Sequence, residues 1–130
     1  MKLIDLLLPF QKRFAQDAAR FLIGLWSRQT GKGYTSSYIA TRDAMTNVRS
    51  NWIIAAPTER QAMETLDKCK DWARKANIMT ANTEEELDGL EKDTKIKAKV
   101  IVFPNGSKIY GLPGRPASLR GFSGSLILDE

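Results

Sequence analysis

The stretch that decides the fold reads Phe21-Leu22-Ile23-Gly24-Leu25-Trp26-Ser27-Arg28-Gln29-Thr30-Gly31-Lys32-Gly33-Tyr34-Thr35. An apolar run ends in a small polar turn, and a helix-compatible segment follows. A buried strand, a turn and a helix in this order are the layout of a phosphate-binding loop, in which backbone N–H groups and the helix dipole hold anionic oxygens. In that layout Lys32 reaches the terminal phosphates.

The stretch departs from the usual pattern G-x-x-x-x-G-K-[ST] at two positions. Trp26 stands where the first glycine is usual, and Gly33 stands where a serine or threonine follows the lysine. A lone Gly31-Lys32 pair after an apolar run is more often an ordinary strand-to-helix turn. The assignment therefore depends on the other motifs of the chain.

The composition predicts one soluble globular domain. The 130 residues are 42% hydrophobic and 27% charged, and no apolar run approaches the roughly 18 residues that a membrane span requires. The single cysteine, Cys69, makes no internal disulfide, which fits the reducing cytoplasm. The absence of histidine excludes Ser-His-Asp chemistry and most zinc sites. The net charge of +5 lies mainly in residues 1–75 and suits either a polyanionic partner or a solvated basic surface.

Helix and strand patterns alternate through the first half of the chain. Near-helical spacing predicts a helix over 31–47, and the compact apolar run 51–56 predicts a buried strand. Thr58 and Gln61 form a capping-box pattern for a helix that continues to about residue 79. Its buried stripe comprises Ala62, Leu66, Cys69, Ala73 and Ala76. This order predicts a mainly parallel sheet with flanking helices.

The N-terminal segment contains a second candidate for nucleotide binding. Pro9 disfavours a continuous helix from the apolar start of the chain, and the helical pattern resumes over 11–22. Gln11 is either a surface glutamine at a helix start or an adenine reader, because a side-chain amide matches the N6 and N7 edge of adenine.

The second half of the chain begins with an acidic segment over 81–93, which we interpret as a solvated connector or short helix. Residues 95–110 predict a β-hairpin around an Asn-Gly turn. Residues 111–124 are rich in glycine, proline and serine and predict a loop. The chain then continues as an apolar strand over 125–128, followed by Asp129 and Glu130.

These motifs contain the groups that phosphoryl transfer from a nucleotide needs. Residues 27–33 provide the phosphate cradle, with Lys32 as its charge. Asp129 is placed to hold Mg²⁺ and Glu130 to polarise the attacking water, because ligands of a parallel sheet bind at the carboxyl ends of its strands. Arg28 could neutralise charge that develops on the γ-phosphate.

The motifs resemble those of the large terminase subunits of tailed bacteriophages, in the order seen in Mu-like members. The resemblance rests on these segments: Ser27 to Lys32, Leu8 to Gln11, Ala55 to Thr58 with Gln61, Phe103 to Ser107, Leu119 to Phe122 and Leu126 to Glu130. It implies an α/β P-loop NTPase fold with a β-hairpin insertion, of which residues 1–130 form the N-terminal part up to the Walker B strand. It implies ATP and Mg²⁺ as cofactors and an ATPase that powers DNA packaging.

The resemblance also assigns roles to residues. The nucleotide-binding residues would be Gln11, Ser27, Arg28, Gln29, Thr30, Gly31, Lys32 and Gly33. Lys32 would bind the β- and γ-phosphates, Arg28 would be the arginine within the loop, and Glu130 would be the catalytic carboxylate. Asp129 would hold Mg²⁺. Because Gly33 lacks the usual hydroxyl, the Mg²⁺ affinity is the weakest part of this expectation, with Thr35 or Ser36 as possible substitutes.

The implied partners are double-stranded DNA, a small terminase subunit and a portal protein, in the cytoplasm of a bacterial host. A ring of copies is implied for the full-length subunit. The nuclease domain of such subunits lies beyond Glu130, so no nuclease activity is expected of this chain. Arg115 and Arg120 are candidates for DNA contact. Two alternatives stay open: a helicase-like ATPase module, and a nucleotide- or DNA-binding remnant that does not hydrolyse ATP.

Overall fold

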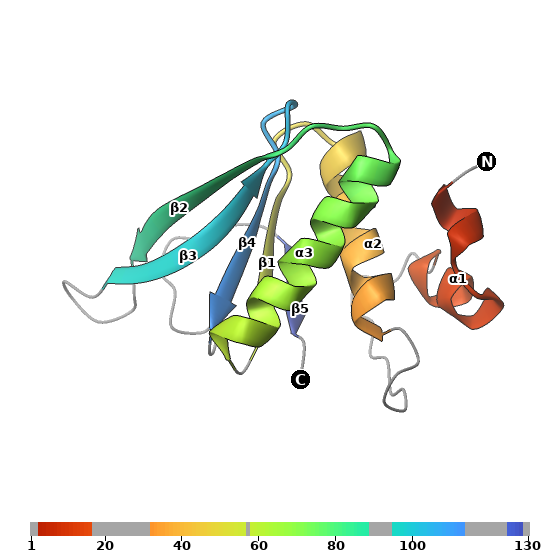
Figure 1. Ribbon diagram of the computed structural model, residues 1–130, viewed down its shortest axis with the longest axis horizontal. Coiled ribbons are helices and arrows are strands. Elements are labelled where there is room, and N and C mark those ends of the chain that lie inside the picture. Colours follow the sequence, from red (N-terminus) through yellow and green to blue (C-terminus); the bar gives the residue numbers. More distant parts are fainter. Residues whose placement is uncertain (1–2, 17–31, 57, 89–94, 114–124, 129–130) are drawn as a thin grey trace.

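The computed structural model describes residues 3–16, 32–56, 58–88, 95–113 and 125–128. The predicted strand over 21–26 lies outside this part. Of the loop predicted over 111–124, residues 111–113 instead belong to a strand, and the remainder lies outside the described residues. In chain order the elements are η1 (Leu3–Leu6), α1 (Pro9–Ala15), α2 (Lys32–Thr46), β1 (Asn51–Ala56), α3 (Glu59–Lys75), β2 (Ala81–Asp88), β3 (Lys95–Val102), β4 (Lys108–Pro113) and β5 (Ser125–Leu128). Figure 1 shows α2 and α3 side by side against the sheet, with α1 next to α2.

The helices of the described part occur where the sequence pattern predicts them. α2 matches the helix predicted over 31–47, whereas α3 ends at Lys75, earlier than predicted. Pro9 is the first residue of α1 and separates it from η1, as expected for a residue that lacks a backbone N–H. The helix predicted over 11–22 is confirmed as far as Ala15, and Gln16 follows in a turn. Residues 17–22 of that range lie outside the described part.

The five described strands form one mixed sheet in the order β2-β3-β4-β1-β5. β1 pairs in parallel with β4 and β5, whereas β3 pairs antiparallel with β2 and β4. The prediction of a mainly parallel sheet was therefore wrong. The predicted hairpin is confirmed, and its tight turn permits only antiparallel pairing of β3 with β4. Gly106 adopts a φ of 88° in this turn, a conformation that favours glycine.

Besides the hairpin, the acidic segment also makes the sheet mixed. It forms strand β2, where we predicted a connector or short helix. In its antiparallel register with β3, Glu84 lies opposite Lys99 and Glu86 lies opposite Lys97. Glu84 and Lys99 form an ion pair. Glu85 pairs instead with Lys108 of β4, at 2.7 Å. Opposite charges on neighbouring strands stabilise their pairing, so lysines of β3 and β4 supply partners for the acidic run.

The sheet has an apolar core on each face. On one face, α2 and α3 pack against the strands through a cluster of Ala40, Ala44, Ile54, Leu66, Cys69, Ala73, Ile101, Phe103 and Ile109. The other face carries a second cluster of Ile53, Ala55, Ala98, Val100, Tyr110 and Leu112. Successive strand residues such as Ile53 and Ile54 alternate between the two clusters. Both are buried, which explains why β1 is apolar from Trp52 to Ala56.

A polar cluster, hereafter the Asp43 cluster, fixes the end of α2 against the start of β1. The carboxylate of Asp43 accepts hydrogen bonds from Ser50 Oγ (2.5 Å), Trp52 Nε1 (2.7 Å) and Asn47 Nδ2 (2.5 Å). Partial burial raises the pKa of Asp43, but the three hydrogen bonds outweigh it and hold the pKa below its ordinary value. The cluster therefore stabilises this connection with Asp43 ionised.

We expect Asp43→Asn to lower the free energy of unfolding by about 2 kcal/mol at pH 7, because it removes a charged acceptor from three donors. The native pKa of Asp43 is depressed, so this stabilisation is complete above the unfolded pKa of roughly 4 and is lost as the pH falls further. Urea titrations should show a smaller difference in the free energy of unfolding between the variant and wild type at pH 3 than at pH 7. Asp71→Asn, which breaks the exposed pair with Arg74, is the control and should cost under about 1 kcal/mol.

Candidate functional site

One edge of the sheet collects the features that the sequence assigns to a binding site. The parallel strands β1, β4 and β5 all end at this edge, at Ala56, Pro113 and Leu128. α2 and α3 both begin there, as Figure 1 shows at the lower end of each helix. Carboxyl ends of parallel strands and helix N-termini form the usual ligand-binding edge of an α/β sheet and favour anions.

The first turn of α2 starts at this edge. Lys32 is the first residue of the helix and Gly33 the second, so the backbone of this turn has the helical form that the phosphate-loop layout predicts. Thr35 is fully buried, whereas Ser36 is only partly buried. Of the two hydroxyls considered as substitutes for the one missing at Gly33, Ser36 is therefore the one with access to solvent.

Gln11 is buried, with only 5% of its surface exposed, so the interpretation as a surface glutamine was wrong. Its Oε1 accepts a hydrogen bond from the backbone N–H of Leu8 at 2.8 Å. Leu8 precedes the first residue of α1, so Gln11 supplies the side-chain half of a capping box. This gives Gln11 a structural role in α1, and its role as an adenine reader stays a prediction.

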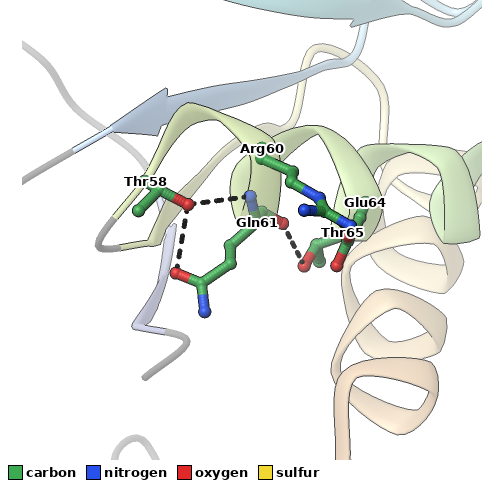
Figure 2. A network of polar contacts seen from close by, with 5 residues as sticks. All are labelled: Thr58, Arg60, Gln61, Glu64 and Thr65. Atoms are coloured by element: carbon green, nitrogen blue, oxygen red, sulfur yellow. Dashed lines mark hydrogen bonds and ion pairs between the residues drawn. The ribbon is translucent and has the colours of Figure 1, made fainter.

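The start of α3 shows how its cap is built (Figure 2). Thr58 Oγ1 accepts a hydrogen bond from the backbone N–H of Gln61 at 3.2 Å, as the capping-box pattern predicts. The side chain of Gln61 takes a different partner from the predicted one: its Oε1 lies 3.3 Å from Thr58 Oγ1, which donates to it. Thr65 Oγ1 donates to the carbonyl of Gln61 and fastens the next turn.

Several predicted site residues lie outside the described part of the chain: Ser27, Arg28, Gln29, Thr30, Gly31, Asp129 and Glu130. The structure places the positions next to them in the sequence. Lys32 begins α2 and Leu128 ends β5, both at the carboxyl edge of the parallel strands. Their roles stay predictions, as do those of Arg115 and Arg120, which also lie outside.

The described residues restrict the chemistry of this region. Cys69 is fully buried, and burial raises the pKa of its thiol to about 12, which disfavours at neutral pH the thiolate that a nucleophile needs. Among the described residues, no three side chains of histidine, cysteine, aspartate or glutamate gather as metal ligands would. Within the same part of the chain, no helix combines the length and apolar character needed to cross a membrane.

Sequence reasoning missed one residue of this region, Trp72. It is fully buried and donates from Nε1 to the carbonyl of Tyr34 in the first turn of α2, at 3.1 Å. Trp72 lies beside the predicted stripe of α3, next to Ala73, and a tryptophan with a buried N–H needs an acceptor. A tryptophan beside the buried stripe was the available signal for such a contact, but the sequence does not show which carbonyl accepts the hydrogen bond.

Comparison with known families identifies the class of protein. The family described as "Terminase large subunit, T4likevirus-type, N-terminal" matches residues 23–130, and the chain belongs to this family. This confirms the resemblance stated from the motifs.

Two curated relatives are similar over nearly the whole chain. "Mu-like prophage FluMu protein gp28" of Haemophilus influenzae is 31% identical over 96% of this chain and 25% of its own length. "Probable terminase, large subunit gp28" of Escherichia phage Mu is 30% identical over 95% of this chain and 23% of its own length. The chain thus spans about a quarter of these relatives. No solved structure matches it.

Proposed function

We propose that this chain is the ATP-binding part of a terminase motor that moves double-stranded DNA into a capsid. The observation that carries the proposal is the shared edge where β1, β4 and β5 end and α2 begins at Lys32. Family membership supports the same function, and the similar phage Mu protein is named a probable terminase large subunit. An isolated Gly-Lys turn would not account for this combination.

For the fold, we propose a P-loop NTPase in which residues 21–26 form a strand beside the described sheet and residues 27–31 lead into α2. The helical backbone from Lys32 onward supports this, because a phosphate loop ends at the first turn of a helix. The Walker B strand would be β5, whose last residue directly precedes Asp129.

For the chemistry, we propose that Lys32 and the N–H groups of residues 27–33 bind the β- and γ-phosphates of ATP. Glu130 orients the attacking water and accepts its proton, and Arg28 stabilises the charge that develops on the γ-phosphate. Gln11 reads adenine through its amide. The alternative of a helicase-like ATPase shares this site and differs in the mechanical task.

For magnesium, we propose Asp129 as the protein ligand, because its carboxylate oxygen is the ligand type that Mg²⁺ prefers. Gly33 supplies no side chain and Thr35 is fully buried, so the further ligands would come from Ser36, water and phosphate oxygens. Bound Mg²⁺ would neutralise phosphate charge. We therefore expect Mg²⁺ binding by this chain to depend less on a side-chain hydroxyl of the helix than in phosphate loops with a serine or threonine after the lysine.

Gly33→Ser provides a gain-of-function prediction for this point. Because Gly33 lies in the helical first turn, serine fits the backbone and removes a glycine that costs helix stability. The new hydroxyl should tighten ATP binding severalfold in Mg²⁺ and leave it unchanged in EDTA, measured by titration calorimetry. Gly33→Ala is the matched control and should gain stability without the Mg²⁺-dependent gain in affinity. Equal affinities for the two variants in Mg²⁺ would contradict the prediction.

The partners follow from the packaging role as proposals: double-stranded DNA, a small terminase subunit, a portal protein and other copies of the subunit in a ring, in the cytoplasm of the bacterial host. A non-hydrolysing nucleotide- or DNA-binding protein is the remaining alternative. The chain spans about a quarter of its curated relatives, so the motor activity of the longer proteins is a proposal for this chain.

The experiment that tests the proposal measures equilibrium binding of ATP, ADP and adenosine to the chain with Mg²⁺. We expect ATP to bind at least tenfold more tightly than adenosine, because the phosphates would make charge-assisted hydrogen bonds at the edge of the sheet. Hydrolysis, with and without duplex DNA, then separates a motor from a binding protein. Equal affinity for ATP and adenosine would contradict a phosphate site.

A further inference from the structure

Trp72 reaches from α3 into the first turn of α2. Its ring is fully buried and packs against the rings of Tyr34 and Tyr38, with centroid distances of 4.5 Å and 5.0 Å. Its Nε1 donates to the backbone carbonyl of Tyr34 at 3.1 Å. One side chain of α3 therefore contacts the beginning of α2 through both its ring and its N–H group.

The same turn receives further contacts. Ser37 Oγ donates to the same carbonyl of Tyr34 at 2.8 Å. Lys75 Nζ donates to the hydroxyl of Tyr34 at 3.0 Å and lies over the ring of Trp72 at 5.0 Å from its centroid. These contacts orient Tyr34, which follows Lys32 by two positions in the helix.

The opposite end of α2 is held by a similar bond. There Trp52 Nε1 donates to Asp43 at 2.7 Å, within the Asp43 cluster. Each end of the helix is thus anchored by an indole N–H from another element. The end held by Trp52 lies away from the carboxyl edge, whereas the end held by Trp72 carries Lys32.

We propose that Trp72 is a positioning residue for phosphate binding. By holding the Tyr34 carbonyl, it fixes the first turn of α2 so that Lys32 and the backbone N–H groups of that turn face the phosphates. Trp72 does this without contacting the nucleotide. The inference rests on the proposed function, because it assumes that phosphates bind at this turn.

The test compares two substitutions of the same kind at the two ends of one helix. Trp72→Phe and Trp52→Phe each keep an aromatic ring and remove an indole N–H donor. Binding of ATP with Mg²⁺ and of adenosine is measured for both variants and wild type, at a temperature where circular dichroism shows each to be folded. We expect Trp72→Phe to raise the Kd for ATP about three- to tenfold, with the Kd for adenosine unchanged. Trp52→Phe should change neither.

Ser37→Ala is the second variant, in case Trp72→Phe does not fold. It removes the other side-chain donor to the Tyr34 carbonyl and introduces a better helix former. We expect it to weaken ATP binding in the same direction by a smaller factor. The inference is overturned if the Kd of Trp72→Phe for ATP equals that of wild type. It is also overturned if the substitution raises the Kd for ATP and the Kd for adenosine by the same factor. With an unfolded Trp72→Phe, wild-type ATP binding by Ser37→Ala overturns it. If wild type binds ATP no better than adenosine, the proposed function fails first.

Discussion

Lys32→Ala is expected to weaken ATP binding by roughly a hundredfold while the chain stays folded. In the proposed site the lysine ammonium binds the β- and γ-phosphates, and hydrogen bonds between charged partners are the strong ones. Lysine and alanine are both good helix formers, so the first position of α2 tolerates the change. Titration calorimetry with ATP and a thermal melt of the same sample would measure both effects.

A matched control separates this effect from a general loss of positive charge. Lys70→Ala removes the same charge from α3, where Lys70 forms an ion pair with Asp67 on the helix surface. We expect ATP affinity to change by less than about twofold in this variant. Unchanged ATP affinity in Lys32→Ala would remove the central residue of the proposed site and, with it, the phosphate-loop interpretation of residues 21–35.

Glu130→Gln is expected to lower the rate of ATP hydrolysis roughly 10²–10⁴-fold and to leave the Kd for ATP within about twofold. Glutamine keeps the size and hydrogen-bonding capacity of the side chain, but it does not accept the proton of the attacking water. A loss of turnover without a loss of binding is the pattern of a group that acts in the transition state. Single-turnover hydrolysis and equilibrium binding of ATP measure the two quantities separately.

Glu64→Gln serves as the control, because Glu64 is an exposed carboxylate on α3 paired with Arg60. Its turnover should equal that of wild type. Wild-type turnover in Glu130→Gln would assign the catalytic carboxylate elsewhere. A wild-type chain that binds ATP and does not hydrolyse it would favour the alternative of a nucleotide-binding protein without a motor function.

The elements that sequence alone predicts correctly are those with a local signal. The apolar run of β1, the stripe of α3 from Ala62 to Ala73 and the Asn105-Gly106 turn each contain their own pattern within a few residues. Ala76, the last member of the predicted stripe, lies beyond the end of α3 and is only partly buried. Strand β2 was missed because its carboxylates become compatible with a strand only when lysines of β3 and β4 lie nearby. The mixed sheet results from that pairing, and a pattern within one sequence segment does not predict which strands pair.

For the candidate site, only the flanking elements and Gln11 can be compared with the prediction, because residues 27–31, Asp129 and Glu130 lie outside the described part. The helix start at Lys32 and the strand end at Leu128 lie where the motifs place them. The capping role of Gln11 was hidden because Leu8, the residue before the helix, supplies only its backbone N–H to the pair. The contact of Trp72 with Tyr34 depends on how two helices pack, so neither sequence segment predicts it.

The pairing order of the strands has a consequence for the way the chain folds. β2, β3 and β4 are neighbours both in sequence and in the sheet, so their pairings close short loops at a small entropic cost. β1 must meet β4 and β5 across long intervening segments, and these pairings are slower to form. We therefore expect the antiparallel half to assemble early and the edge that contains the candidate site to be completed last.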